Sequence, residues 1–230
     1  MKIIILAGSG ISEDSGIPTY YNNSKNGLWN INDLNKICVK NKDRTNESFD
    51  FYNIFRFLLK TCKPNENHDI INNIQQKYEN VKIYTFNIDE LLESSNCKNV
   101  IHLHGKVNEI KCKKCLNIQN IDFQEIKLNH QYLYCNSDDS IRNNIIYYGE
   151  KCNYGSLIND IFELDENDIL IYIGSSNNSF DLNQIIKPLK FNKILINPNL
   201  STFNGDTKQY IIFDKLNESI FSCIDGIIKD

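Results

Sequence analysis

An apolar segment near the start of the chain, together with the glycine-rich loop after it, constrains the fold more than any other stretch. Residues 3–7 read Ile-Ile-Ile-Leu-Ala, and residues 8–18 continue as Gly-Ser-Gly-Ile-Ser-Glu-Asp-Ser-Gly-Ile-Pro. A short, β-branched run without a polar residue predicts a strand that is buried on both faces, at the centre of a parallel sheet. The glycines that follow it allow the backbone to turn tightly and to approach a ligand closely.

The polar residues of this loop fit the beginning of a helix that binds phosphate. Ser12, Asp14 and Ser15 favour a helix N-terminus, whose free N–H groups and positive end attract anions. A strand, Gly-x-Gly and a helix start form the layout of a dinucleotide site, although Glu13 stands where the fingerprint has its third glycine. The loop alone therefore fits both a dinucleotide site and an ordinary glycine-rich turn.

Length, charge and cysteine content narrow the class of protein. The 230 residues can build one large core and a small additional module. A net charge of −4 argues against a nucleic-acid binder held by a basic face. No apolar stretch is long enough to span a bilayer and no secretion signal is recognisable, so we expect a cytoplasmic protein without a membrane partner. In that reducing compartment, the eight cysteines favour metal binding or free thiols over disulfides.

Hydrophobic periodicity predicts strands and helices in alternation, which is typical of an α/β fold. We expect further strands at 81–85, 100–103, 145–148, 168–173, 193–196 and 210–213. Helices are expected at 47–61, from a cap at Asn65 or Asn67, after Asp89, at 156–164 and at 216–228. His68 falls in the first turn of the second of these helices, where a structural role is the favoured interpretation.

Polar residues follow the predicted strands at their carboxyl ends, where ligands bind in parallel sheets. Asn87 and Asp89 come after 81–85, although Asp89 could equally cap the next helix. His102 and His104 are expected on the same side of the extended chain. His104 precedes a glycine at the end of its strand, which makes it a candidate general base near neutral pH. Two more polar strand ends suit phosphate or ribose contacts, at Gly174, Ser175 and Asn197.

A cysteine knuckle interrupts the sheet pattern. Cys112 and Cys115 form a Cys-x-x-Cys pair in lysine-rich surroundings, and Cys135 lies at the usual distance for a second pair. Asp138 stands where the fourth cysteine would be, and a carboxylate oxygen is an acceptable zinc ligand. The four residues fit a tetrahedral zinc site, and they also fit an empty knuckle with three ordinary thiols.

The order of motifs along nearly the whole chain resembles the sirtuins, which are NAD-dependent protein deacylases. Residues 8–18 are similar to the Gly-Ala-Gly-x-Ser and Ser-Gly-Ile-Pro loop of that family. Further matches follow in the family's order: Gly27-Leu28-Trp29, Pro64-Asn65 with His68, Thr85 with Asn87-Ile88-Asp89 and Leu91, Leu103-His104-Gly105, Tyr148-Gly149-Glu150, Gly174-Ser175-Ser176 and Ile196-Asn197. Each motif is modest, but the ordered set is highly specific.

The resemblance implies an α/β architecture: a Rossmann-like parallel sheet with helices on both faces, and a small inserted module of the zinc-ribbon type. The large domain would cover approximately residues 1–35, 63–104 and 145–230, and the small module approximately 36–62 and 105–144. NAD and an acyl-lysine peptide would meet in the cleft between them. Zinc would be structural, because four protein ligands leave no open position.

The resemblance also implies roles for single residues. His104 would be the general base, and Asn87 and Asp89 would hold the nicotinamide-ribose region, with Ser12 close by. Tyr20 would keep an aromatic ring near the reactive face. The ADP-ribose would be lined by Gly8, Ser9, Gly10, Gly174, Ser175 and Asn197. The reaction would release nicotinamide and free lysine and transfer the acyl group to ADP-ribose.

The sequence departs from the sirtuin pattern at several places near the expected site. The usual Asp-Phe-Arg after Ser-Gly-Ile-Pro is Thr-Tyr-Tyr at 19–21, which removes a positive charge. Phe86 replaces a glutamine and Leu92 replaces a histidine, and the loop 177–179 is more polar than usual. These changes leave Asn87, Asp89 and His104 in place, and they leave the acyl preference open.

Three functions therefore compete. The first is a lysine deacylase that forms O-acyl-ADP-ribose. The second keeps NAD cleavage but changes the acceptor, to water in an NAD glycohydrolase or to a protein side chain in a mono-ADP-ribosyltransferase. The third is an NAD-binding sensor or scaffold with little activity, which would not need a base such as His104.

Overall fold

The computed structural model describes residues 1–19, 37–40, 43–127, 130, 140–176 and 182–229. The segment 3–7 forms β1 (Ile3–Ala7), which lies inside a six-stranded parallel sheet with the strand order β3-β2-β1-β7-β8-β9. The other strands of this sheet are β2 (Val81–Thr85), β3 (Ile101–His102), β7 (Ile169–Ile173), β8 (Asn192–Ile196) and β9 (Ile211–Phe213).

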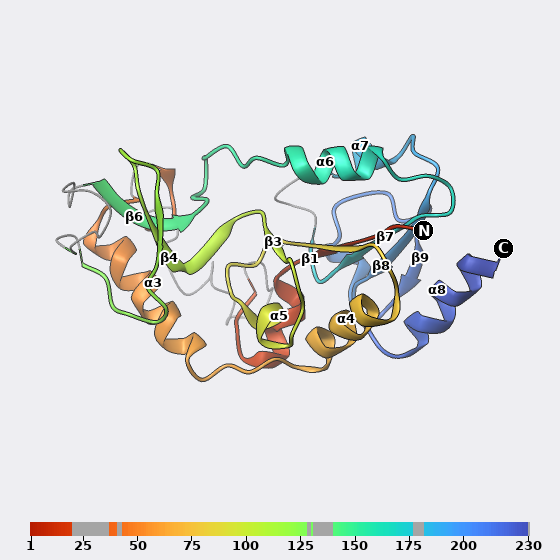
Figure 1. Cartoon of the computed structure of the whole chain (residues 1–230), viewed down its shortest axis with the longest axis horizontal. Coiled ribbons are helices and arrows are strands. Elements are labelled where there is room, and N and C mark those ends of the chain that lie inside the picture. The colour runs from red at the N-terminus through yellow and green to blue at the C-terminus, as the bar shows by residue number, and fades with distance from the viewer. Residues whose placement is uncertain (20–36, 41–42, 128–129, 131–139, 177–181, 230) are drawn as a thin grey trace.

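Helices cover both faces of the sheet, as Figure 1 shows. On one face lie α4 (Glu66–Lys77), α5 (Leu91–Ser94) and α8 (Ser219–Lys229), and on the other α6 (Gly155–Phe162) and α7 (Leu182–Ile186). The side chains of β1 alternate between the two cores: Ile3 and Ile5 pack with α4 and α8, and Ile4 and Leu6 with α6 and α7. A central strand buried on both faces cannot carry polar residues, which explains its sequence. The prediction of a Rossmann-like α/β fold is confirmed.

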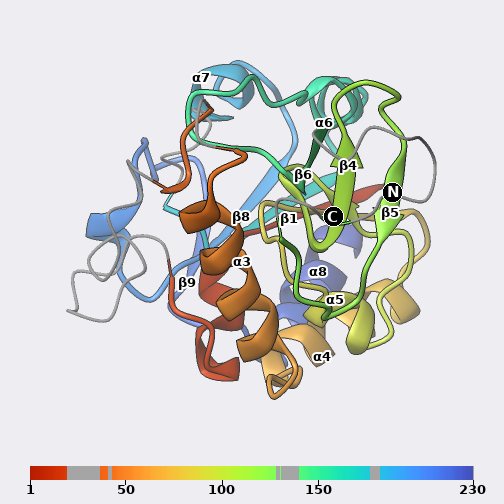
Figure 2. The same cartoon turned by 90° about the vertical axis from the view of Figure 1, so that its left-hand side faces the viewer.

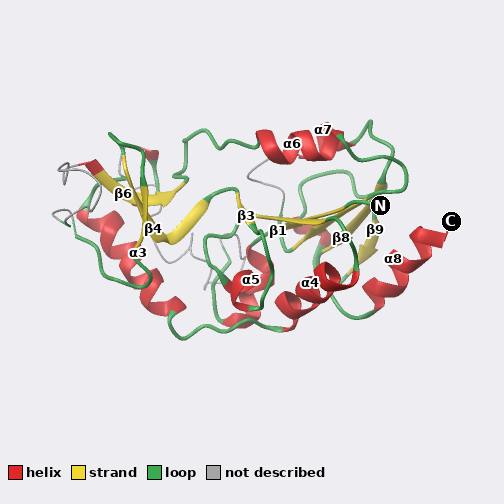
Figure 3. Cartoon of the chain, viewed as in Figure 1, coloured by secondary structure: helices red, strands yellow, loops and turns green. Residues whose placement is uncertain are grey.

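A second, antiparallel sheet lies at the end of the molecule away from the two chain termini (Figures 1 and 3). It contains β4 (Gly105–Cys112), β5 (Ile118–Asn120) and β6 (Ile141–Ile145) in the order β5-β4-β6. Helix α3 (Asn46–Leu59) runs alongside it, as the turned view of Figure 2 shows, and Phe49 of this helix packs into its core. These elements fall within the predicted ranges 36–62 and 105–144 except for Ile145, the last residue of β6, and the domain boundaries stay a prediction.

The prediction of a strand at 145–148 was wrong in its position. The strand is β6 (Ile141–Ile145), which pairs antiparallel with β4. The sequence did not predict this strand because it contains polar residues. Arg142 and Asn143 are buried there, where they form hydrogen bonds with Glu150 and Arg56. The apolar residues that suggested the strand instead join the two sheets, since Ile145 and Tyr147 pack with residues from α3 and from the loop after β2.

Short helical turns complete the described part of the chain. The 3-10 helix η1 (Ser9–Ser15) follows β1, and η4 (Leu200–Thr202) follows β8. The helical turn that the polar residues Ser12, Asp14 and Ser15 suggested is present as η1, which begins at Ser9 directly after Gly8. Among the described residues, no helix is both long enough and apolar enough to cross a membrane.

Candidate active site

Two glycine-led loops meet at the carboxyl ends of β1 and β7. A side chain on Gly8 would place its Cβ 2.5 Å from the Cβ of Ser175, and one on Gly10 would lie 2.9 Å from the Cα of Gly174. Gly174 itself has a φ of +64°, which side chains rarely adopt. The glycines are therefore required by the close approach of the two loops.

This packing also uses two backbone N–H groups of the glycine-rich loop. The backbone N–H of Gly8 donates to the carbonyl of Ile173 at 2.8 Å, and that of Gly10 donates to Gly174 at 2.7 Å. These two donors are therefore used within the fold. The second loop also contains Ser175, whose hydroxyl lies 3.2 Å from the Tyr172 hydroxyl.

Three predicted site residues from distant parts of the chain meet in one buried cluster. The Ser12 hydroxyl donates to Asp89 Oδ2 at 3.1 Å, and the Asn87 amide donates to Ser12 Oγ at 3.2 Å. All three residues are at least nine-tenths buried. Asp89 also accepts from the backbone N–H of Leu91 through Oδ1 at 3.1 Å. Asp89 thus binds Ser12 through one oxygen and the first N–H of α5 through the other, although the N-cap residue of α5 is Glu90. Its contact with a ligand stays a prediction.

His68 belongs to the same cluster, a contact that the sequence did not reveal. Its Nδ1 lies 3.2 Å from the backbone nitrogen of Asn65, within the capping box at the start of α4. Its Nε2 lies 3.4 Å from Ser12 Oγ. Nδ1 also lies 3.1 Å from Asn65 Oδ1, so the ring is held against the capping residue on one side and against Ser12 on the other. The Pro-Asn-x-x-His motif was the only available signal, because a lone histidine in a first turn is normally structural.

Burial sets the charge state of this cluster. It lowers the pKa of His68 to about 4, so the ring is neutral at physiological pH. Burial also raises the pKa of Asp89, and the hydrogen bonds from Leu91 and Ser12 oppose that rise. The cluster therefore holds one carboxyl group whose ionisation depends on nearby donors.

One buried acceptor in the cluster has no partner among the described residues. Asn87 donates its backbone N–H to Thr85 Oγ1 at 3.0 Å and its side-chain amide to Ser12, but its Oδ1 makes no hydrogen bond. An unpaired buried amide oxygen costs free energy of roughly 1–3 kcal/mol. It fits a ligand that brings a hydroxyl or amide donor, as the ribose and carboxamide of NAD would.

His104 lies in the turn that follows β3, beside the aromatic rings of Phe86 and Tyr154. Its ring centroid is 5.2 Å from that of Phe86, and its Nε2 is 3.4 Å from the Tyr154 hydroxyl. Burial lowers the pKa of His104 to about 4, and a hydrogen bond to the backbone of Phe86 opposes this effect. His104 is therefore neutral at physiological pH and able to accept a proton.

The two neighbouring histidines do not share surroundings, although an extended chain would place them on one side. Strand β3 ends at His102, and a turn follows. The Nδ1 of His102 lies 2.9 Å from the backbone oxygen of Asn87, and its Nε2 lies 2.8 Å from Glu93. His104 contacts neither of these groups in the described structure and faces Tyr154 instead.

The remaining predicted ligand residues are only partly placed. Asn197 is buried at the end of β8, and its Oδ1 accepts from the backbone of Asn199 at 2.9 Å. Ser9 begins η1 between the two close-packed glycines. Tyr20 and the polar residues at 177–179 lie outside the described residues.

The cysteine knuckle is described only in its first half. Cys112 is fully buried at the end of β4, and its Sγ accepts from the backbone N–H groups of Lys114 at 3.3 Å and Cys115 at 3.5 Å. Such N–H···S bonds stabilise a thiolate, so this turn fits a metal-bound cysteine. Cys135 and Asp138 lie outside the described residues. Among the residues that the structure describes, no three histidine, cysteine or acidic side chains are grouped so that they could hold a metal ion.

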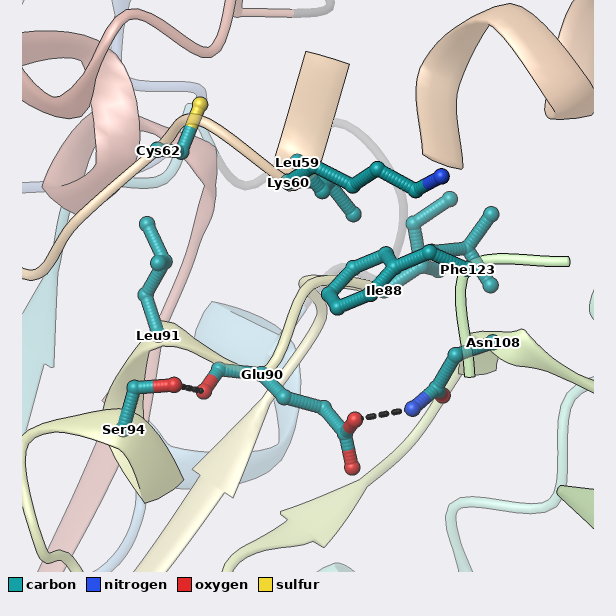
Figure 4. Close-up of a pocket in the computed structure, with 10 residues that line it drawn as sticks. Leu59, Lys60, Cys62, Ile88, Glu90, Leu91, Ser94, Asn108 and Phe123 are labelled. Carbon is teal, nitrogen blue, oxygen red and sulfur yellow. Dashed lines mark hydrogen bonds between the residues drawn. The ribbon is translucent and has the colours of Figure 1, made fainter. Parts of the chain in front are cut away.

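A cavity of about 220 Å³ lies next to Ile88, in the loop after β2 (Figure 4). Ile88 lines this cavity, whereas its two neighbours bind Ser12. The walls come from the end of α3, from α5 and from β4, and Phe123 forms part of them. The polar cluster and the cavity thus share one short stretch of backbone.

Comparison with known proteins agrees with this geometry. The model of the Sir2 family matches residues 8–180. The chain belongs to the Sir2 family. An NAD-dependent protein deacylase of Campylobacter jejuni is 32% identical over 233 residues, covering 100% of this chain and 95% of the relative. NAD-dependent protein deacylase 1 of Caldanaerobacter subterraneus is 31% identical and covers 75% of this chain and 71% of the relative.

The fold of this Sir2 protein also matches solved structures. A crystal structure of a Sir2 homologue in complex with NAD superimposes with a TM-score of 0.77 at 23% identity, covering 99% of this chain and 90% of the other. At that level of identity the match supports the fold alone. The resemblance to sirtuins is thereby confirmed by the family model, and the roles of single residues remain predictions.

Proposed function

We propose that this Sir2 protein is an NAD-dependent protein lysine deacylase. The buried Ser12, Asn87 and Asp89 cluster carries this proposal, because its unpaired Asn87 Oδ1 offers an acceptor to a bound ligand. A neutral base, His104, lies at the neighbouring strand end. The names of the relatives from Campylobacter jejuni and Caldanaerobacter subterraneus support the same activity.

NAD, when bound, supplies an electrophilic ribose carbon and nicotinamide as the leaving group. Asn87 would orient the nicotinamide-ribose region through Oδ1, and Asp89 would stabilise positive charge that develops there. Ser12 and His68 would hold Asp89 and Asn87 in place through the hydrogen bonds described above. His104 would accept a proton from a ribose hydroxyl, a role that its neutral state permits.

The ADP-ribose part would lie along the two glycine loops. Ser9 and Ser175 would contact it there, and Asn197 would approach from the end of β8. Gly8, Gly10 and Gly174 would shape this wall by letting the loops approach each other. The substrate would be an acyl-lysine in a protein or peptide. A cytoplasmic location and the absence of nucleic-acid and membrane partners are proposals from the sequence.

Release of nicotinamide from NAD tests the function directly. We expect the purified protein to release nicotinamide only when an acyl-lysine peptide is present, because the acyl oxygen is the nucleophile that the reaction needs. The rate of nicotinamide release with a panel of peptides that carry different acyl groups identifies the preferred acyl chain. Release at the same rate without any peptide would contradict deacylation and support the glycohydrolase or ADP-ribosyltransferase alternative. Binding of NAD without any release would support a sensor.

We further propose that Cys112, Cys115, Cys135 and Asp138 bind a structural zinc ion. The two N–H···S bonds to Cys112 support this site. Purified protein should then contain about one zinc ion per chain, and Cys112→Ser should lower that content and the melting temperature together. Cys223→Ser is the control, since this partly buried cysteine lies on α8 and far along the chain from the knuckle. A protein without zinc, and with unchanged melting in Cys112→Ser, would contradict the site.

A further inference from the structure

His102 occupies an unusual position beside the catalytic cluster. Its side chain is only 4% exposed, and both of its ring nitrogens face oxygen atoms. Nδ1 lies 2.9 Å from the backbone oxygen of Asn87, and Nε2 lies 2.8 Å from Glu93 Oε1. A carbonyl oxygen can only accept a hydrogen bond, so Nδ1 must carry a proton.

The state of Glu93 decides whether Nε2 carries a proton as well. Glu93 Oε1 also accepts from Lys106 Nζ at 2.9 Å, and an ionised carboxylate is an acceptor only. Hydrogen bonds to His102 and Lys106 outweigh desolvation and lower the pKa of Glu93 to about 2. Glu93 Oε1 and the Asn87 carbonyl both act as acceptors here, so a doubly protonated ring, an imidazolium, satisfies both contacts of His102.

The surrounding charges balance this cation. Lys106 Nζ contacts Glu90 Oε1 at 2.7 Å in addition to Glu93, and Glu90 in turn bonds to Asn108 of β4, as Figure 4 shows. Two carboxylates, from α5 and the loop before it, thus face one lysine from β4. An imidazolium at His102 supplies a second positive charge, without which two carboxylates would share the charge of Lys106 alone.

The network reaches the reaction centre through Asn87 and Asp89. Three polar groups of Asn87 are held: its N–H by Thr85, its carbonyl by His102 and its amide nitrogen by Ser12. This arrangement fixes the direction of the unpaired Oδ1. The positive charge of His102 also opposes the rise in the pKa of Asp89 that burial causes, whereas Glu93 adds to that rise.

We propose that His102 is a positioning residue that acts as an imidazolium: it holds the backbone of Asn87 and favours the charged form of Asp89. The charged groups that face it are Glu93 from α5 and Asp89 from the loop after β2, with Lys106 from β4 on the far side of Glu93. The kinetic part of this proposal rests on the proposed function. The protonation part does not, because it concerns the folded protein alone.

Nitrogen-15 NMR of the histidine rings tests the protonation state in the full chain. The chain has four histidines, and the His102 signals are those lost in His102→Gln. At neutral pH we expect the two ring nitrogens to show similar shifts, as in a doubly protonated ring. In Glu93→Gln, which keeps the side-chain size but removes the charge, we expect the two different shifts of a neutral ring. A neutral His102 in the natural protein would overturn the proposal.

Kinetics and the Asn87 side-chain amide signals test the positioning role. We expect His102→Gln to lower kcat for nicotinamide release by about tenfold or more while KM for the peptide changes by less than about twofold. It should also shift the Asn87 amide signals. Glu79→Gln is the control, because Glu79 is exposed and has no charged partner among the described residues. A His102→Gln variant with unchanged Asn87 signals, or with the kcat of the natural protein, would refute the role. If the natural protein releases no nicotinamide, the proposed function fails while both NMR measurements still decide this proposal.

Discussion

His104→Ala is expected to lower kcat for deacylation by about 10²–10⁴-fold and to leave the affinity for NAD nearly unchanged. The residue provides a neutral imidazole in the turn after β3, and neither His68 nor His102 is placed to replace it. His68 has its ring nitrogens against Asn65 and Ser12, and His102 has both of its ring nitrogens bound. Calorimetric titration with NAD, together with nicotinamide release in the presence of the peptide, measures both quantities.

The pH dependence gives an independent test of the same role. Burial lowers the pKa of His104 from its ordinary value of 6.5 to about 4, so the unprotonated, basic form persists well below neutral pH. Activity that depends on this base should therefore fall only as the pH approaches about 4, and the fall near 6.5 that an exposed histidine would cause should be absent. An acid limb near 6.5, or near-full turnover of His104→Ala, would mean that another group is the base.

The central elements of the fold could be predicted from the sequence because their chemistry is local. The strand Ile3–Ala7 has five apolar residues and is buried on both faces, so its period and composition agree with its environment. The helix from Asn65 carries its own capping signal, which the structure shows as a capping box with His68. Asn87, Asp89 and Ser12 could be grouped because polar residues at the ends of parallel strands face one edge of the sheet.

Features that depend on distant partners could not be predicted. Strand β6 contains Arg142, which looks like a surface residue in sequence but is buried against Glu150 and the ring of Tyr147. The shape of the loop 9–15 depends on Gly174, which lies more than a hundred residues away. His102 looked like a companion of His104, and only the positions of Glu93 and the Asn87 carbonyl reveal its separate surroundings.

Gly105→Ala is the substitution from which we expect the largest loss of stability. Gly105 has a φ of +78°, and a Cβ at this position would lie 2.0 Å from the backbone oxygen of Asn144. That backbone belongs to β6, which pairs with Gly105 through Ile145. Neither strand can yield without breaking the antiparallel ladder, so we expect the free energy of unfolding to fall by roughly 2–5 kcal/mol.

Substitutions at two other glycines distinguish the effect of the steric clash from the effect of a positive φ. Gly149 has a φ of +85°, but the space that a Cβ would occupy there is open, so Gly149→Ala should cost only about 1–2 kcal/mol. Gly226 lies within α8 with open space and no positive φ, so Gly226→Ala should raise stability by up to about 1 kcal/mol. Urea unfolding of the three variants gives the ranking directly.

Gly105→Ala should also affect activity, because Gly105 follows His104 directly. Any shift of β4 away from β6 moves His104 relative to Asn87, so kcat should fall in Gly105→Ala even where the protein remains folded. Gly149→Ala and Gly226→Ala should retain the nicotinamide release of the natural protein under those conditions. Equal stability losses in Gly105→Ala and Gly149→Ala would show that the β4–β6 contact yields without cost. In that case the close approach of the two strands would not be what requires a glycine after His104.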